Sequence, residues 1–165
     1  PFLFFDHFGP MDVAPEDNHD VRPHPHIGLS TVTYLFEGAI LHRDSVGSVQ
    51  RIEPGAINWM TAGRFIVHSE RTGPDVRARG HRMHGIQSWV GLPQADEKTD
   101  PSFQHVGSRD LPYREENGVA LRLAAGRAFG LACTHSSSRA SVRWRAEACF
   151  SSTARRACFC SSHDE

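Results

Sequence analysis

Residues 23–37 read PHPHIGLSTVTYLFE, and this stretch indicates the fold of the chain. Its second part, residues 29–37, is rich in β-branched and aromatic side chains, which favour strands. Its first part places His24 and His26 two residues apart, and in a strand such residues project from the same face. If no bulge interrupts the segment, the apolar residues at even positions, such as Tyr34, share the face of the two histidines.

A second pair with the same spacing, His68 and Glu70, follows some forty residues later in the sequence His68-Ser69-Glu70. Two strands facing each other with these pairs would bring three imidazoles and one carboxylate to one point. A structural zinc site more often uses cysteines and closes its tetrahedron, whereas imidazoles with a carboxylate suit a metal that keeps open positions. The spacing therefore predicts a catalytic or sensory metal site inside an all-β domain.

Chance is the alternative interpretation, because the chain holds eleven histidines. His42 and Asp44 form a third pair of the same spacing, with no better claim to be structural. Spacing alone leaves both interpretations open.

Composition limits the other possibilities. With 165 residues and 18.3 kDa, the chain is long enough for one domain with a real core. A net charge of -1 and a pI near 7.0 provide no basic field, so we expect no direct binding of nucleic acid. Since there is no apolar run of about 18 residues and no signal-type N-terminus, we expect no membrane association and a cytoplasmic location.

Turn residues divide the rest of the chain into short strands, which is typical of a sandwich or a barrel. Residues 94–118 form a long polar connection in this interpretation. The pattern predicts a β-meander of about seven or eight strands, the others besides 29–37 being 39–44, 49–53, 56–60, 65–70, 83–92 and 119–124.

The composition changes abruptly at Gly130. All 14 glycines and all 10 prolines lie at or before this residue, and all four cysteines lie after it. We therefore expect a folded domain at residues 1–130 and a different tail at residues 131–165. Val142, Ala146 and Cys149 could line one face of a poor helix in the tail.

Three stretches resemble the N-terminal domain of the pirin family, a branch of the cupin superfamily. They are PHPHIGLSTVTYLFEGAILHRDSVGSV at residues 23–49, IEPGAINWMTAGRFIVHSER at residues 52–71 and MHGIQSWVGLP at residues 83–93. The resemblance implies an all-β fold with a cupin-type β-barrel or jelly-roll sandwich. Pirins resemble two such barrels in one chain, so we expect the second barrel of the family to be missing here.

The same resemblance implies an iron site in the first barrel. Carried over by residue, the metal ligands are His24, His26, His68 and Glu70, and the expected cofactor is Fe(II) or another divalent transition metal. The pair formed by His42 and Asp44 falls in a family motif outside this ligand set.

Two classes of function follow from the resemblance. Several pirins are similar to flavonol (quercetin) 2,3-dioxygenases, which implies a small aromatic substrate such as a flavonol. In that case Glu70 is also the candidate catalytic residue, because it could leave the metal and accept the proton of the substrate hydroxyl. The alternative is an iron- or redox-responsive regulatory protein that acts through contact with a protein partner. A non-functional truncated fragment is the third possibility.

Two departures from the family pattern lead to further expectations. Phe65 replaces the second glycine of a loop that usually reads TAGRG, and we expect strain if that position needs a positive φ. The tail at residues 131–165 is interpreted as a frameshifted translation or a disordered segment. A cysteine metal or redox site at Cys158 and Cys160 is the competing interpretation, although their spacing matches no established ligand pattern.

Two residues of the MHGIQ stretch, His84 and Gln87, are candidates to orient a metal ligand from outside the ligand set. Each could equally be structural.

Overall fold

The computed structural model describes residues 2–133, 146–151 and 156–161, with side chains described up to residue 133. All of its described regular elements except one short helix are strands, which confirms the all-β prediction. In chain order the elements are β1 Phe2–Val13, β2 Val21–His26, β3 Leu29–Glu37, β4 Ile40–Asp44, β5 Val49–Ile52, β6 Ile57–Thr61, β7 Ile66–Arg71, α1 Pro74–Arg79, β8 His81–Gly91, β9 Ser102–Val106, β10 Tyr113–Glu116, β11 Val119–Ala125, β12 Arg127–Ala128, β13 Leu131–Ala132, β14 Ala146–Ser151 and β15 Arg156–Ser161.

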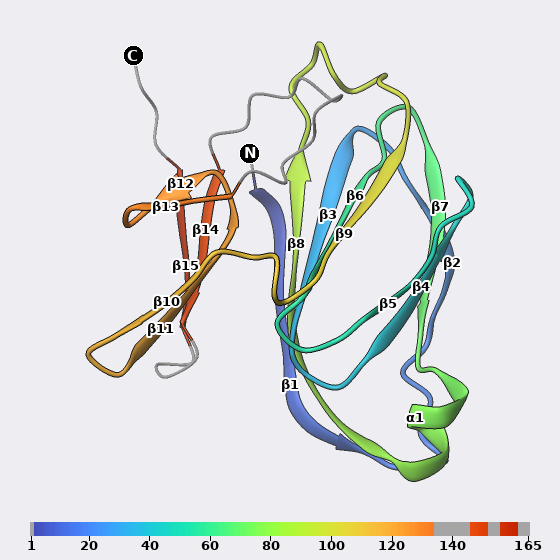
Figure 1. Cartoon of the computed structure of the whole chain (residues 1–165). Helices are drawn as coiled ribbons and strands as arrows, with labels where there is room; N and C mark the ends of the chain where they lie inside the picture. Colours follow the sequence, from blue (N-terminus) through green and yellow to red (C-terminus); the bar gives the residue numbers. More distant parts are fainter. Residues whose placement is uncertain (1, 134–145, 152–155, 162–165) are drawn as a thin grey trace. The chain divides into compact units, whose positions relative to one another are not determined.

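The chain divides into two compact units, Pro1–Ser108 and Arg109–Glu165. Two antiparallel sheets build the first unit, a five-stranded sheet in the order β1-β8-β3-β6-β9 and a four-stranded sheet in the order β2-β7-β4-β5. Figure 1 shows them as two layers, with β2, β4, β5 and β7 on one side. The first unit is therefore a β-sandwich.

The expected meander is wrong. In both sheets most neighbouring strands are distant in sequence, as in the pairing of β3 with β8 and of β2 with β7. The two sheets of a sandwich pack through their apolar inner faces, and the chain here crosses repeatedly from one sheet to the other, so strands that are distant in sequence become neighbours. Strand patterns predict the elements but not this long-range pairing.

Among the described residues, polar side chains separate two apolar clusters of the sandwich interior. One cluster joins Leu35, Ile52 and Ala56, with Phe8, Ile40 and Met83 packed against it. The other cluster joins Met60, Ala62 and Ile66, with Phe103 against it. Between them, Thr33 of β3 is paired with Gln87 of β8 on one side and Asn58 of β6 on the other. This polar layer is where charged and metal-binding groups can be held without exposure to solvent.

Strand parity at β3 differs from the expectation. Thr33, at an odd position, donates its hydroxyl hydrogen bond to Glu70 and accepts one from Gln87. Tyr34, at an even position, packs against Phe36. The reason is that β2 and β3 belong to different sheets, and the chain turns between them at Gly28, which has φ +66. The parity of β2 therefore does not continue into β3.

Three elements of the first unit, β1, β9 and α1, were not predicted from the sequence. The strand β1 contains Pro10 beside a register irregularity, and it is an edge strand, where proline is tolerated. The strand β9 lies within the connection expected at residues 94–118 and contributes Phe103 to the core. The helix α1 has Pro74 in its first turn and is followed by Gly80 as its C-cap residue.

Within the described residues α1 is the single helix, and it is too short to cross a membrane.

The second unit contains a four-stranded sheet in the order β10-β11-β14-β15 and the two-stranded pair β12-β13. Residues 146–151 are a strand, so the helix expected around Ala146 and Cys149 is wrong there, and Val142 lies outside the described residues. The side chains of Cys158 and Cys160 also lie outside the described part. The boundary at Gly130 and the frameshift hypothesis remain predictions.

The loop before β7 tolerates Phe65. Its φ is not positive, and half of the side chain is exposed, so the expected strain is absent. The glycine that the loop requires is Gly63, with φ +52 and its carbonyl oxygen bonded to the amide of Gly28 at 2.8 Å. The backbone of Thr99 lies directly against the Gly63 α-carbon, and a Cβ there would collide with the Thr99 carbonyl oxygen.

We predict that Gly63→Ala lowers the free energy of unfolding by roughly 2 kcal/mol or more, because strain and collision add. Gly47→Ala is the matched control: Gly47 has φ +94 and nothing within 4 Å of an added Cβ, so strain acts alone. Urea denaturation of both variants measures the difference. An equal loss in the two would contradict a close approach of Thr99.

Candidate metal centre

The pairing of β2 with β7 brings the two predicted dyads together. These strands are antiparallel neighbours with His24 opposite His68 and His26 opposite Ile66. The sequence prediction placed the dyads on strands that face each other, whereas they lie side by side in one sheet. Directly opposite residues in an antiparallel pair have Cβ atoms about 4.5–5.5 Å apart, so the imidazoles meet on one face.

The three histidines form a compact cluster. The ring centroids of His24 and His68 are 4.4 Å apart, and those of His26 and His68 are 5.0 Å apart. The Nε2 atoms of His24 and His26 are separated by 3.1 Å. One ligand atom from each of the three residues lies within 4.8 Å of the other two. His26 and His68 are buried, and His24 is half-buried.

These residues fit a metal ion on three observations. The buried Nε2 of His68 has no hydrogen-bond partner among the described residues. The Nδ1–H of His24 donates to the carbonyl of Arg22 at 2.8 Å, which places the His24 lone pair on Nε2, the atom that faces His26. Two nitrogens at about 2.1 Å from an ion and at right angles lie about 3 Å apart, close to the observed separation of the His24 and His26 nitrogens.

The fourth predicted ligand, Glu70, is close to only one of the three clustered histidines, His68. A carboxylate oxygen of Glu70 lies within 4.8 Å of a ring nitrogen of His68 and of His42, but it is not grouped with His24 and His26. The carboxylate is held by Gln87, whose amide Nε2 donates to both oxygens at 3.1 Å. Binding of all four residues to one ion therefore remains a prediction.

Of the two residues expected to orient a ligand, Gln87 contacts Glu70. Its own Oε1 accepts a hydrogen bond from the indole Nε1 of Trp89 at 3.2 Å, which turns the amide NH₂ toward the carboxylate. The other candidate, His84, lies elsewhere, with its Nε2 at 2.8 Å from the Nε2 of His7.

His42, which the resemblance placed outside the ligand set, lies beside the cluster. The ring of His42 lies against His68, with the two Nδ1 atoms 3.5 Å apart, and its Nε2 donates to Asp44 at 2.9 Å. The i, i+2 spacing of His42 and Asp44 was the available signal. Sequence alone could not show that β4 pairs with β7 and carries this dyad to the same place.

Burial controls the protonation of this cluster. It lowers the pKa of His68 to about 3, with smaller effects of the neighbouring His24, His26 and His42. Burial, together with His24, lowers the pKa of His26 to about 4. Burial opposes the ionisation of Asp44, yet hydrogen bonds from His42 and Ser48 keep its pKa below the usual value. The imidazoles of His26 and His68 are therefore neutral at pH 7, as metal ligands must be.

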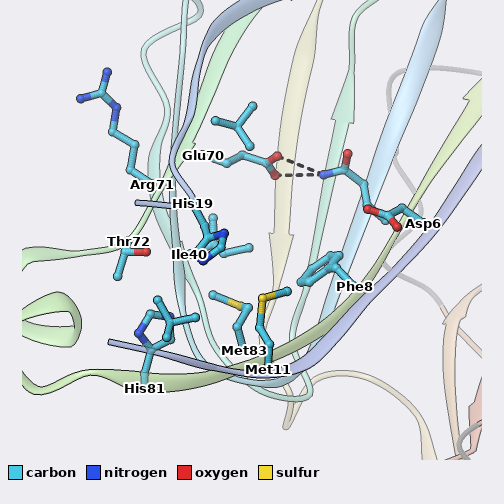
Figure 2. A pocket seen from close by; sticks show the side chains of 13 residues that line it. Asp6, Phe8, Met11, His19, Ile40, Glu70, Arg71, Thr72, His81 and Met83 are labelled. Atoms are coloured by element: carbon cyan, nitrogen blue, oxygen red, sulfur yellow. Dashed lines mark hydrogen bonds between the residues drawn. The ribbon is translucent and has the colours of Figure 1, made fainter. Parts of the chain in front are cut away.

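A cavity of about 260 Å³ opens between the two sheets beside Glu70. Figure 2 shows the carboxylate of Glu70 at one end, facing the amide of Gln87. Phe8, Met11 and Met83 form part of the walls, His19 lies midway along the cavity, and His81 lies toward the other end. Its lining comes from both sheets and includes Asp6, Phe8, Met11, Val13, Val21, Ile40, Arg71, Thr72 and Met83. Glu70 thus belongs to the wall of the cavity and also lies within ligand distance of His68.

Comparison with known proteins identifies the class of this sandwich. The family model described as Pirin matches residues 1–90, more than half of the chain. The chain belongs to the pirin family, and its first unit has the cupin-type fold that the sequence predicted.

Individual relatives agree with this assignment. A pirin-like protein of Caulobacter vibrioides is 57% identical over 133 residues, which is 79% of this chain and 46% of the relative. Pirin-1 of Arabidopsis thaliana is 40% identical over 108 residues, or 66% of this chain and 36% of the relative. A crystal structure of quercetin 2,3-dioxygenase from Acinetobacter baumannii has a TM-score of 0.77 and 34% identity, covering 90% of this chain and 46% of that chain. The chain spans about half the length of such relatives or less.

We predict that the chain binds one transition metal ion, with Fe(II) as the test metal, and that His24→Ala removes stoichiometric binding because it deletes one of the three clustered imidazoles. Elemental analysis after anaerobic loading and desalting measures the metal content. His19→Ala, which changes an exposed histidine outside the cluster, should retain the metal. Unchanged iron in His24→Ala would overturn the assignment.

The metal-free protein should lose stability as the pH falls below about 6.5, the ordinary histidine pKa. Below this pH the two histidines are protonated in the unfolded chain. In the folded chain His26 and His68 remain neutral until the pH approaches their lowered pKa values of about 4 and about 3. Each group contributes up to about 1.4 kcal/mol per pH unit to this loss. Thermal unfolding between about pH 7 and pH 5 measures it, and His68→Asn should have a shallower slope. A slope unaltered by that replacement contradicts the burial argument.

Proposed function

We propose that this pirin domain binds a single iron ion and uses it to act on a small aromatic substrate such as a flavonol. The observation that carries the proposal is the cluster of His24, His26 and His68, whose ligand atoms lie within 4.8 Å of one another and in which the buried Nε2 of His68 has no partner among the described residues. Fe(II) suits a set of neutral imidazoles with a carboxylate nearby and with open positions for other ligands. On this proposal the working location is the cytoplasm, where ferrous iron is available.

The cavity supports an aromatic substrate. Its walls are largely apolar, as most small-molecule sites are, and a polar end at Glu70 adjoins the histidine cluster. A flat substrate between Phe8 and the methionines would present a hydroxyl to the Glu70 carboxylate. The chain thereby binds the substrate between its two sheets and excludes water from the reacting end.

The proposed reaction is the 2,3-dioxygenation of quercetin or a related flavonol, with release of carbon monoxide. The similarity to a protein named quercetin 2,3-dioxygenase supports this choice. When bound, the metal supplies Lewis acidity that lowers the pKa of a coordinated substrate hydroxyl. Glu70 accepts the proton of that hydroxyl, and Gln87 holds the two carboxylate oxygens in place before substrate arrives.

A regulatory role is the second candidate, favoured by a different observation. Phe2, Leu3, Phe4 and Phe5 are 36–64% exposed on the edge strand β1, an apolar surface suited to a protein partner. β1 pairs Asp6 with Gln87, which bonds the Glu70 carboxylate, so the metal site and this strand are connected. Hydrogen exchange of β1 should then differ between the Fe(II) and Fe(III) forms, and identical exchange would rule the connection out.

We also propose that the pirin-like domain ends near Gly130 and that residues 131–165 arise from a frameshift. Translation of the nucleotide sequence downstream of Gly130 in the other two frames tests this. Recovery of cupin-like sequence is expected, and its absence counts against the frameshift.

We predict that the Fe(II)-loaded chain consumes oxygen and releases carbon monoxide when quercetin is added. Glu70→Gln should lower kcat about 10²- to 10⁴-fold, the usual contribution of a general base. Glu97→Gln, at an exposed position, should leave the rate unchanged. Loss of quercetin absorbance and oxygen uptake measure the rate.

No turnover by iron-replete protein would refute the dioxygenase. Turnover that Glu70→Gln leaves intact would instead refute only the role of Glu70 as the base.

A further inference from the structure

One buried pair, His42 and Asp44, has no role in the function proposed above. Both side chains are almost fully enclosed, with exposed fractions of 3% and 0%. Burial of an imidazole and a carboxylate is costly unless each group is hydrogen-bonded. Asp44 is hydrogen-bonded to His42, and His42 in turn contacts His68, so the pair can influence this histidine.

Asp44 is held in place by hydrogen bonds that do not involve His42. Its Oδ1 accepts hydrogen bonds from the backbone amides of Val46 and Ser48, at 3.0 and 2.9 Å, which closes the turn between β4 and β5. The other oxygen, Oδ2, is left to accept the Nε2–H of His42 at 2.9 Å. An ionised carboxylate only accepts hydrogen bonds, so Nε2 of His42 carries a proton, and in a ring with a single proton Nδ1 then carries the lone pair.

The ring of His42 is also held by packing. It is stacked on Phe103 of β9, with centroids 4.3 Å apart and planes 18° from parallel. On its other side lies His68, with centroids 5.2 Å apart. The ring therefore cannot turn to offer a different nitrogen without losing the Phe103 contact or the Asp44 hydrogen bond.

The consequence falls on His68. Its Nδ1 lies 3.5 Å from the Nδ1 of His42, a long hydrogen bond that requires the proton to be on His68. A neutral imidazole with Nδ1–H has its lone pair on Nε2, and this is the buried atom without a partner. The chain of contacts thus leaves Nε2 of His68 free for a metal ion.

We propose that Asp44 and His42 are positioning residues that fix the tautomer and orientation of His68 for metal binding. The inference rests on the proposed metal site and adds the means by which its most buried ligand is prepared. His42 acts through His68 and is not itself a ligand, because Asp44 and His68 occupy its two nitrogens. A ligating histidine commonly donates its second N–H to a carboxylate, and here an intervening imidazole carries that link from Asp44.

The decisive variant is Asp44→Asn. An amide retains the oxygen that closes the turn but replaces Oδ2 with an NH₂ donor, so Nε2 of His42 must become an acceptor. The proton of His42 then moves to Nδ1, which reverses its contact with His68 and puts the His68 proton on Nε2. Asp12→Asn, at an exposed position on β1, is the matched control.

Two measurements test this. Long-range ¹H–¹⁵N NMR of the metal-free protein should show His68 as the Nδ1–H tautomer in the native chain and in Asp12→Asn, and as the Nε2–H tautomer in Asp44→Asn. Titration with Co(II), followed by its visible absorption bands, should give a Kd about 10- to 100-fold weaker in Asp44→Asn and unchanged in Asp12→Asn.

His42→Phe retains an aromatic ring against Phe103 and provides the second variant. It should weaken Co(II) binding to a similar degree while the ligand-field spectrum keeps its shape. Abolished binding or an altered spectrum in His42→Phe, with Asp44→Asn unaffected, would make His42 a ligand and overturn the proposal.

The proposal is also overturned by native Co(II) affinity in Asp44→Asn, or by an Nε2–H tautomer of His68 in the native chain. Failure of the native chain to bind Co(II) at all would instead refute the metal site itself, and the tautomer result remains separate evidence on the positioning pair.

Discussion

The antiparallel pairing of β2 with β7 is the constraint on which the site depends. It places His24 directly opposite His68, two residues that are 44 positions apart in the chain, and it aligns both on one face of the four-stranded sheet. A shift of this register by one residue would turn the His68 side chain to the other face, away from the cluster. The pairing of β4 with β7 then adds His42 on the other flank of His68. Ligand geometry in this domain is therefore a consequence of strand register.

The sandwich interior makes that register useful. Two apolar clusters hold the sheets together, and the polar layer between them contains Thr33, Gln87 and Glu70. Because water is largely excluded, each polar group there needs a partner, and the partners define orientation: Gln87 clamps Glu70, and Asp44 holds His42. The same enclosure lowers the pKa of His26 and His68 and so keeps these two imidazoles neutral. Packing and metal affinity are thus linked through desolvation.

Much of this could be predicted from sequence. Residues 29–37 form a strand with the bounds expected, and the i, i+2 spacing of histidines predicted a shared face for His24 and His26. These features are local, since strand periodicity needs no knowledge of distant residues. The spacing of the two dyads also predicted that His68 meets these histidines, and the resemblance favoured this set over His42 and Asp44.

The remaining features depend on contacts that a single sequence does not display. The meander was wrong because crossing connections pair strands that are far apart in the chain. The resemblance left His42 outside the ligand set, and its contacts with His68 and Phe103 could not be predicted because they come from β7 and β9. Phe65 raised an expectation of strain that its backbone does not have, since the positive φ of this loop belongs to Gly63.

X-ray absorption at the iron edge of the Fe(II)-loaded chain tests the central claim most directly. The account predicts a shell of three imidazole nitrogens at about 2.0–2.2 Å, with the outer-shell scattering typical of histidine rings and remaining ligands that are oxygen. A shell of oxygen ligands alone, or one containing sulfur, would contradict the assignment of His24, His26 and His68 as the metal centre.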